Sequence, residues 1–195
     1  SSFADPEVAA LVPAPVRVQL NVTVRRGSLV ESRHRVQAAW CDSGGRLEGG
    51  TGEPRLVTTL RSSAKPFQLL PLVERGHAER WGFTAEELAV MTASHTGTAY
   101  HVALVQGILD KLGLDAGALA CGWHEPFDAE ARESVQRDPG RRTPLQHNCS
   151  GKHSGMLALA LAEGWPVEGY ELGTHPLQQL MRRTIAEMAG LRSED

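Results

Sequence analysis

The chain has 195 residues, of which 41% are hydrophobic and 22% charged, and its net charge is −3. This is the composition of an ordinary globular protein, which argues against wholesale disorder. A pI near 6.2 excludes the broad basic surface of a nucleic-acid-binding protein, and no apolar run approaches the roughly 20 residues that span a bilayer. Three scattered cysteines are too few for a disulfide framework, so we expect a cytoplasmic protein.

The N-terminal part of the sequence predicts antiparallel strands. Residues 1–15 carry three prolines and form a leading segment. Apolar and polar residues then alternate over residues 16–25, which predicts a half-buried strand. A second alternating segment, residues 33–41, ends in the turn-forming residues Asp42-Ser43-Gly44-Gly45. We expect a hairpin or meander here.

The remainder of the chain predicts helices. Apolar residues at helical spacing, several of them followed by a glycine that ends the helix, mark segments at residues 66–74, 84–91, 101–112, 152–163 and 177–188. A charged segment with three prolines, residues 125–146, predicts a mobile surface loop with one short helix. Strands followed by a run of helices indicate an α+β fold.

The first candidate for chemistry is a Ser-x-x-Lys pattern, Ser62 to Lys65, directly before Pro66. Residues three apart share one face of a helical turn, so the Lys65 amine can take the proton of the Ser62 hydroxyl. Because a residue before proline avoids the α region, we expect the helix to begin at Pro66. The alternative is that Ser62 or Ser63 caps the helix and that Lys65 is a surface charge.

A second candidate follows an apolar helix, at Ala93-Ser94-His95-Thr96-Gly97-Thr98. This polar, turn-forming segment either carries a hydroxyl or an imidazole into a cleft, or simply ends one helix and caps the next. The residues alone favour the second interpretation.

The third candidate, residues 147–155, is the densest cluster of reactive side chains in the chain. It is not a phosphate loop, because Gln146 stands where the first glycine is required. Cys149 with His147, His153 or a neutral Lys152 is able to form a metal site. Two other interpretations remain. The segment is either the start of a helix that binds a carboxylate or a glycine-rich turn with a buried cysteine.

Four segments taken together resemble the L-asparaginase II family, the Ser-Lys type of asparaginase. In chain order they are residues 61–68, 93–97, Cys121-Gly-Trp-His124 and residues 147–156. The resemblance runs from the first strand to the end of the chain, and residues 147–156 are its most specific part. It implies that residues 1–195 are the N-terminal part of an asparaginase II-like domain, with an α+β fold related to serine β-lactamases and glutaminases. It also implies hydrolysis of L-asparagine to L-aspartate and ammonia through an acyl-enzyme.

The resemblance also implies roles for individual residues. Ser62 and Lys65 would form the first Ser-Lys pair, with Ser94 a second essential hydroxyl close to it. Cys149 and Lys152 would bind a zinc ion that tunes substrate binding. The substrate pocket would include Arg61, Asn148 and His153.

The sequence departs from the family pattern at its end. The family has a second lysine and a further cysteine ligand, in an Asp-Gly-Cys motif, downstream of where this sequence stops, so we expect an incomplete chain. One alternative is a non-catalytic, zinc-structured binding module with Cys149 and His147 or His153 as ligands. Another is a penicillin-binding or β-lactamase-like acyl-transferase, whose S-D-N and K-T-G companions are absent. An exposed strand edge and several apolar helices are compatible with a homodimer.

Overall fold

The computed structural model describes residues 19–53 and 56–191. The chain divides into two compact units, residues 1–59 and 60–195, each of which is described by itself. The first unit contains antiparallel strands and the second contains helices, which confirms the predicted α+β fold. In the described part of the chain no helix is long and apolar enough to cross a bilayer. All three cysteines are free thiols.

Within residues 19–53 the first unit has two separate two-stranded antiparallel sheets. Strand β1 (Leu20–Arg26) pairs with β2 (Leu29–Val36), and β3 (Ala38–Cys41) pairs with β4 (Leu47–Thr51). The predicted turn after residue 41 joins the second pair, where the Gly45 amide donates to the Asp42 carbonyl over 3.0 Å.

Two details of the strand prediction are wrong. All seven residues of β1 are exposed rather than half-buried, and among the described residues its sheet consists of β1 and β2 alone. The second predicted strand is two strands, which separate at Gln37. Residues 16–18 of the first predicted strand and the leading segment 1–15 lie outside the described residues.

The second unit contains the predicted helices. Within the described residues its α-helices are α2 (Lys65–Glu74), α3 (His77–Arg80), α4 (Ala85–Thr92), α5 (Ala99–Leu112), α6 (Ala129–Arg137), α7 (Ser150–Ala162) and α8 (Pro176–Met188). Helix α4 begins with a capping box, in which the Glu87 amide donates to Thr84 Oγ1 and the Thr84 amide donates to Glu87 Oε2. The same Glu87 carboxylate pairs with Lys111 Nζ near the end of α5, at 2.6 Å.

The charged segment at residues 125–146 is largely ordered into short elements. Asp128 caps α6, and 3₁₀ turns follow at Pro139–Arg141 and Pro144–Gln146. The predicted short helix is therefore present, and the mobility of the segment stays a prediction.

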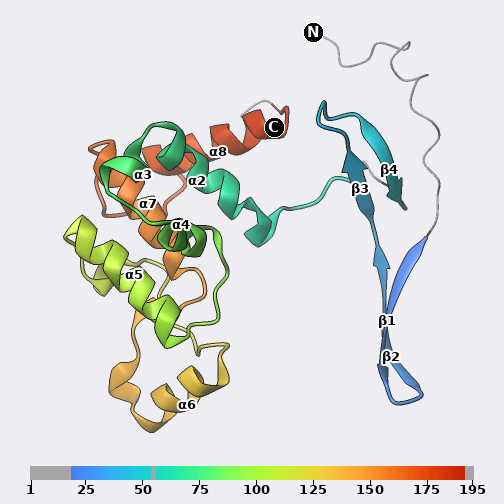
Figure 1. Ribbon diagram of the computed structural model, residues 1–195, viewed down its shortest axis with the longest axis horizontal. Coiled ribbons are helices and arrows are strands. Elements are labelled where there is room, and N and C mark those ends of the chain that lie inside the picture. Colours follow the sequence, from blue (N-terminus) through green and yellow to red (C-terminus); the bar gives the residue numbers. More distant parts are fainter. Residues whose placement is uncertain (1–18, 54–55, 192–195) are drawn as a thin grey trace. The chain divides into compact units, whose positions relative to one another are not determined.

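Helix α7 is the centre of the second unit and buries ten of its thirteen residues. It packs against α2, α4 and α5, as its orange ribbon in Figure 1 shows. A Cβ atom on Gly151 would lie 2.2 Å from the Val90 carbonyl oxygen, so only glycine allows α7 to approach α4 this closely. This packing fixes the position of the first turn of α7, which carries the third candidate segment.

Candidate active site

The first candidate residues lie where the chain enters α2. A 3₁₀ turn, Arg61–Ala64, precedes the helix, and Arg61 adopts the left-handed conformation with φ of 49°. That conformation costs a non-glycine residue about 1 kcal/mol. The expected helix start is wrong by one residue, because Lys65 lies in the α region despite the proline that follows it. Ser62 stands exposed on the turn.

The Lys65 side chain turns inward and reaches the loop after α4. Lys65 is 4% exposed, and its Nζ donates to the Ala93 carbonyl over 2.6 Å and to Ser94 Oγ over 2.8 Å. In the described part of the chain no carboxylate forms an ion pair with Lys65, and the Ser62 hydroxyl makes no hydrogen bond to it. The structure thus brings Lys65 and Ser94 together, with Ser62 three residues away on an exposed turn.

The third candidate segment opens α7. Cys149 is the N-cap residue, its side chain makes no capping bond, and Lys152 lies in the first turn of the helix. Burial lowers the pKa of Lys152, the neighbouring Cys149 thiol opposes this shift, and the nearby Lys65 side chain adds to it. Lys65 and Lys152 also line one small pocket beside Met91 and Met156. The two lysines therefore meet in one region of the second unit.

Two further predicted residues, Asn148 and His153, are held by His124 and Tyr170. The backbone amide of Asn148 donates to His124 Nε2 over 3.0 Å, and the side-chain Oδ1 of Asn148 lies 3.1 Å from the same nitrogen. His153 is 8% exposed and its Nδ1 lies 2.6 Å from the Tyr170 hydroxyl. Burial, and then the charge of Lys152, lower the pKa of His153 to about 3, so its imidazole is uncharged at neutral pH.

No individual site role was predicted for His124 or Tyr170. His124 belongs to the Cys-Gly-Trp-His motif, which was the available signal for it. No pattern indicated Tyr170, because its contacts with His153 and with the Ala120 amide depend on how distant segments pack.

The described residues do not form a zinc site by themselves. Cys149 and Lys152 would supply two donors, whereas catalytic zinc sites have three protein ligands. The Cys121 thiol interacts electrostatically with both, but burial raises its pKa to about 11 and its Sγ faces the Pro144 carbonyl. Within residues 19–53 and 56–191 no group of three or more His, Cys, Asp or Glu side chains is arranged to bind a metal. Zinc stays a prediction of the resemblance.

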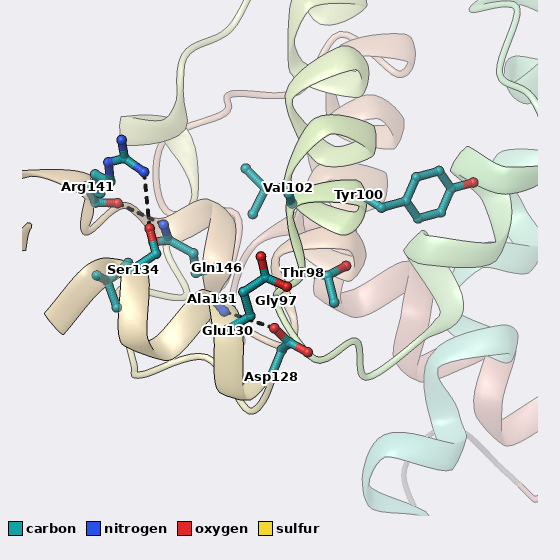
Figure 2. A pocket seen from close by; sticks show the side chains of 12 residues that line it. Gly97, Thr98, Tyr100, Val102, Asp128, Glu130, Ala131, Ser134, Arg141 and Gln146 are labelled. Carbon is teal, nitrogen blue, oxygen red and sulfur yellow. Dashed lines mark hydrogen bonds between the residues drawn. The ribbon is translucent and has the colours of Figure 1, made fainter. Parts of the chain in front are cut away.

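A larger pocket, of about 540 Å³, lies between the start of α5 and α6. Figure 2 shows Thr98 and Val102 on one side of it and Glu130 and Ser134 on the other. None of the predicted site residues lines this pocket. Several of its polar groups bond to one another, as Ser134 Oγ does with Arg141. It is separate from the Lys65 and Ser94 contact.

Comparison with known families decides the classification. A model of the L-asparaginase II family matches residues 22–195, which span both units and contain every predicted site residue. The chain belongs to the L-asparaginase II family. Membership in the L-asparaginase II family makes it an asparaginase-type hydrolase with a small-molecule substrate. No curated protein matches the chain.

Proposed function

We propose that the protein hydrolyses the side-chain amide of L-asparagine to L-aspartate and ammonia through a seryl acyl-enzyme. The observation that carries the proposal is the 2.8 Å contact between Nζ of the buried Lys65 and Ser94 Oγ. Lys65 itself is three residues after the exposed Ser62 in the sequence. Family membership supports the substrate class.

In the proposed reaction the Ser62 hydroxyl oxygen attacks the amide carbon of asparagine. The hydroxyl proton passes to the neutral amine of Lys65, which Ser94 contacts, and backbone N–H groups stabilise the oxyanion. The carbon–nitrogen bond then breaks, and Lys65 returns the proton to the departing nitrogen, which leaves as ammonia. Water attacks the resulting ester, which releases aspartate and restores the Ser62 hydroxyl.

The surroundings of Lys65 suit this role. A lysine acts as a base only from its unprotonated form. In the described part of the chain no carboxylate forms an ion pair with Lys65, in contrast to Lys111, which pairs with Glu87. The Lys65 contacts are instead a carbonyl and a hydroxyl.

The test is ammonia release from asparagine by the purified protein and its Ser62→Ala variant. We expect a loss on the order of 10³-fold or more, as for other removed nucleophiles, together with loss of the acyl-enzyme adduct in mass spectrometry. Ser63→Ala is the matched control, because the Ser63 hydroxyl donates to the Leu60 carbonyl and has no other hydrogen bond among the described residues. Equal rates for the protein and Ser62→Ala would contradict the proposal.

A second pair of variants tests the base. Lys65→Arg keeps the positive charge but removes a group that is able to lose its proton, so we expect activity to disappear. Lys111→Arg is the control, since Lys111 lies in an ion pair. If Ser94→Ala abolishes the acyl adduct and Ser62→Ala does not, the roles of the two serines are exchanged.

A further inference from the structure

The loop between α4 and α5, which carries Ser94, is joined to the start of α7 by the side chain and backbone of His95. His95 is 3% exposed. Its backbone amide donates to the Asn148 carbonyl over 3.1 Å, and its ring Nε2 lies 2.8 Å from Ser150 Oγ. These two bonds connect the second and third candidate segments, and His95 and Ser150 are 55 residues apart in the sequence.

The direction of the hydrogen bonds around His95 follows from the donors alone. The Gly97 amide lies 3.2 Å from His95 Nδ1, and a backbone amide only donates, so Nδ1 is an acceptor. The ring proton therefore sits on Nε2 and is donated to Ser150 Oγ. The Ser150 hydroxyl in turn donates to the Leu145 carbonyl over 2.8 Å. Both ring nitrogens of His95 are thus used in hydrogen bonds within the protein, so His95 has no free N–H proton or nitrogen lone pair for a substrate.

Ser94 itself has little else to hold it in place. Its residue is exposed, and in the described part of the chain its hydroxyl has Lys65 as its hydrogen-bond partner. A loop displacement of about 1 Å would break the 2.8 Å contact with Lys65, and misplacements of that size cost on the order of 10²-fold in rate. The residue next to it, His95, is the one that is anchored.

We propose that His95, through Ser150, is a positioning residue that holds Ser94 within hydrogen-bond distance of Lys65. This inference rests on the proposed amidohydrolase function. His95 does not touch the substrate and takes no part in proton transfer. Its contribution is to tie the Ser94 loop to the first turn of α7.

The test compares two substitutions that each keep half of the imidazole. In His95→Gln the amide nitrogen replaces Nε2 and is able to donate to Ser150. In His95→Asn the side-chain oxygen replaces Nδ1 and accepts from Gly97, but the side chain is too short to reach Ser150. We expect kcat to fall about 10²-fold in His95→Asn with KM within about threefold of the wild-type value, and His95→Gln to recover most of kcat.

His175 offers a matched control for the structural cost of such a change. Its Nδ1 also accepts from the amide two residues later, at 3.2 Å, and its Nε2 lies 3.0 Å from the Pro166 carbonyl. It is 9% exposed, and its ring packs against Trp165 rather than against the Lys65 and Ser94 contact. We expect His175→Asn to lower the thermal midpoint without changing kcat. Equal kcat values in His95→Asn and His175→Asn would overturn the proposal.

A second readout does not depend on asparagine hydrolysis. Amine-reactive labelling followed by mass spectrometry resolves all three lysines of the chain, and Lys111 serves as the internal reference. Release of Ser94 should make Lys65 react several-fold faster in His95→Asn and leave its rate unchanged in His95→Gln. Absence of ammonia release from the wild-type protein would defeat the proposed function alone. An unchanged Lys65 labelling rate in His95→Asn would defeat the positioning role.

Discussion

Strand β1 and helix α7 both follow from clear apolar patterns in the sequence, yet they differ completely in burial. All seven residues of β1 are exposed, whereas α7 buries ten of thirteen. An apolar pattern marks the face that is able to become buried, but burial requires a second layer, which α2, α4 and α5 supply for α7. A two-stranded hairpin has marginal stability in water. We therefore expect substitutions in the two regions to differ in their effect on unfolding.

The largest effect is expected from Gly151→Ala. The added Cβ would lie 2.2 Å from the Val90 carbonyl oxygen, and a backbone atom is unable to move aside as a side-chain end does. We expect a loss of more than about 3 kcal/mol in the free energy of unfolding, measured by urea denaturation with circular dichroism. Gly173→Ala is the control, because nothing lies within 4 Å of its Cβ position. Equal stability of the two variants would show that α7 does not depend on this close approach.

Truncation of a core side chain on α7 should come next. Leu157 is fully buried, at 0% exposure, so Leu157→Ala removes packed atoms and leaves a cavity. We expect the free energy of unfolding to fall by about 3 kcal/mol in the same urea experiment. A loss below about 1 kcal/mol would mean that this part of the core relaxes to fill the cavity.

The buried histidines of the second unit predict a dependence on pH. Burial, and then His101, lower the pKa of His95 from 6.5 to about 4. Below pH 6.5 the unfolded chain takes up a proton that the folded protein does not, so stability falls as the pH decreases. We expect a loss of about 2 kcal/mol between pH 7 and pH 5 from this residue. His95→Gln should show a correspondingly smaller loss, and an identical pH profile would contradict the assignment.

The smallest effect is expected in the hairpin. Val22 lies in the middle of β1 and is 49% exposed, so Val22→Thr changes little buried surface and keeps a β-branched side chain. We expect a change within about 0.5 kcal/mol in the free energy of unfolding. A loss comparable to that of Leu157→Ala would show that β1 is covered in the protein in solution, and would remove the contrast between the two regions.

Local rules predicted the helices of the second unit well. Gly113 and Gly164, which were expected to end helices, have positive φ values of 68° and 71°. The strand boundary at Gln37 was missed, because the alternation of apolar residues continues through it.

In the candidate site, residue spacing in the sequence did not predict which side chains contact each other. The Ser-x-x-Lys spacing placed Ser62 and Lys65 on one turn, but the hydrogen-bond partner of Lys65 is Ser94, which lies 29 residues away. Such a contact depends on how α2 packs against α4, which no local pattern encodes. The resemblance to a known family supplied the role of Ser94, whereas the contacts of His95 and of Tyr170 emerged only from the structure.

The ion pair between Glu87 and Lys111 has a consequence for the order of folding. It joins the start of α4 to the end of α5, so it closes a segment of fewer than 30 residues. The loop that carries Ser94 connects the other ends of these two helices. Closing a short segment costs less chain entropy than joining this loop to Ser150, 55 residues away. We expect α4 and α5 to gain protection early in pulsed hydrogen exchange, before the loop between them meets α7.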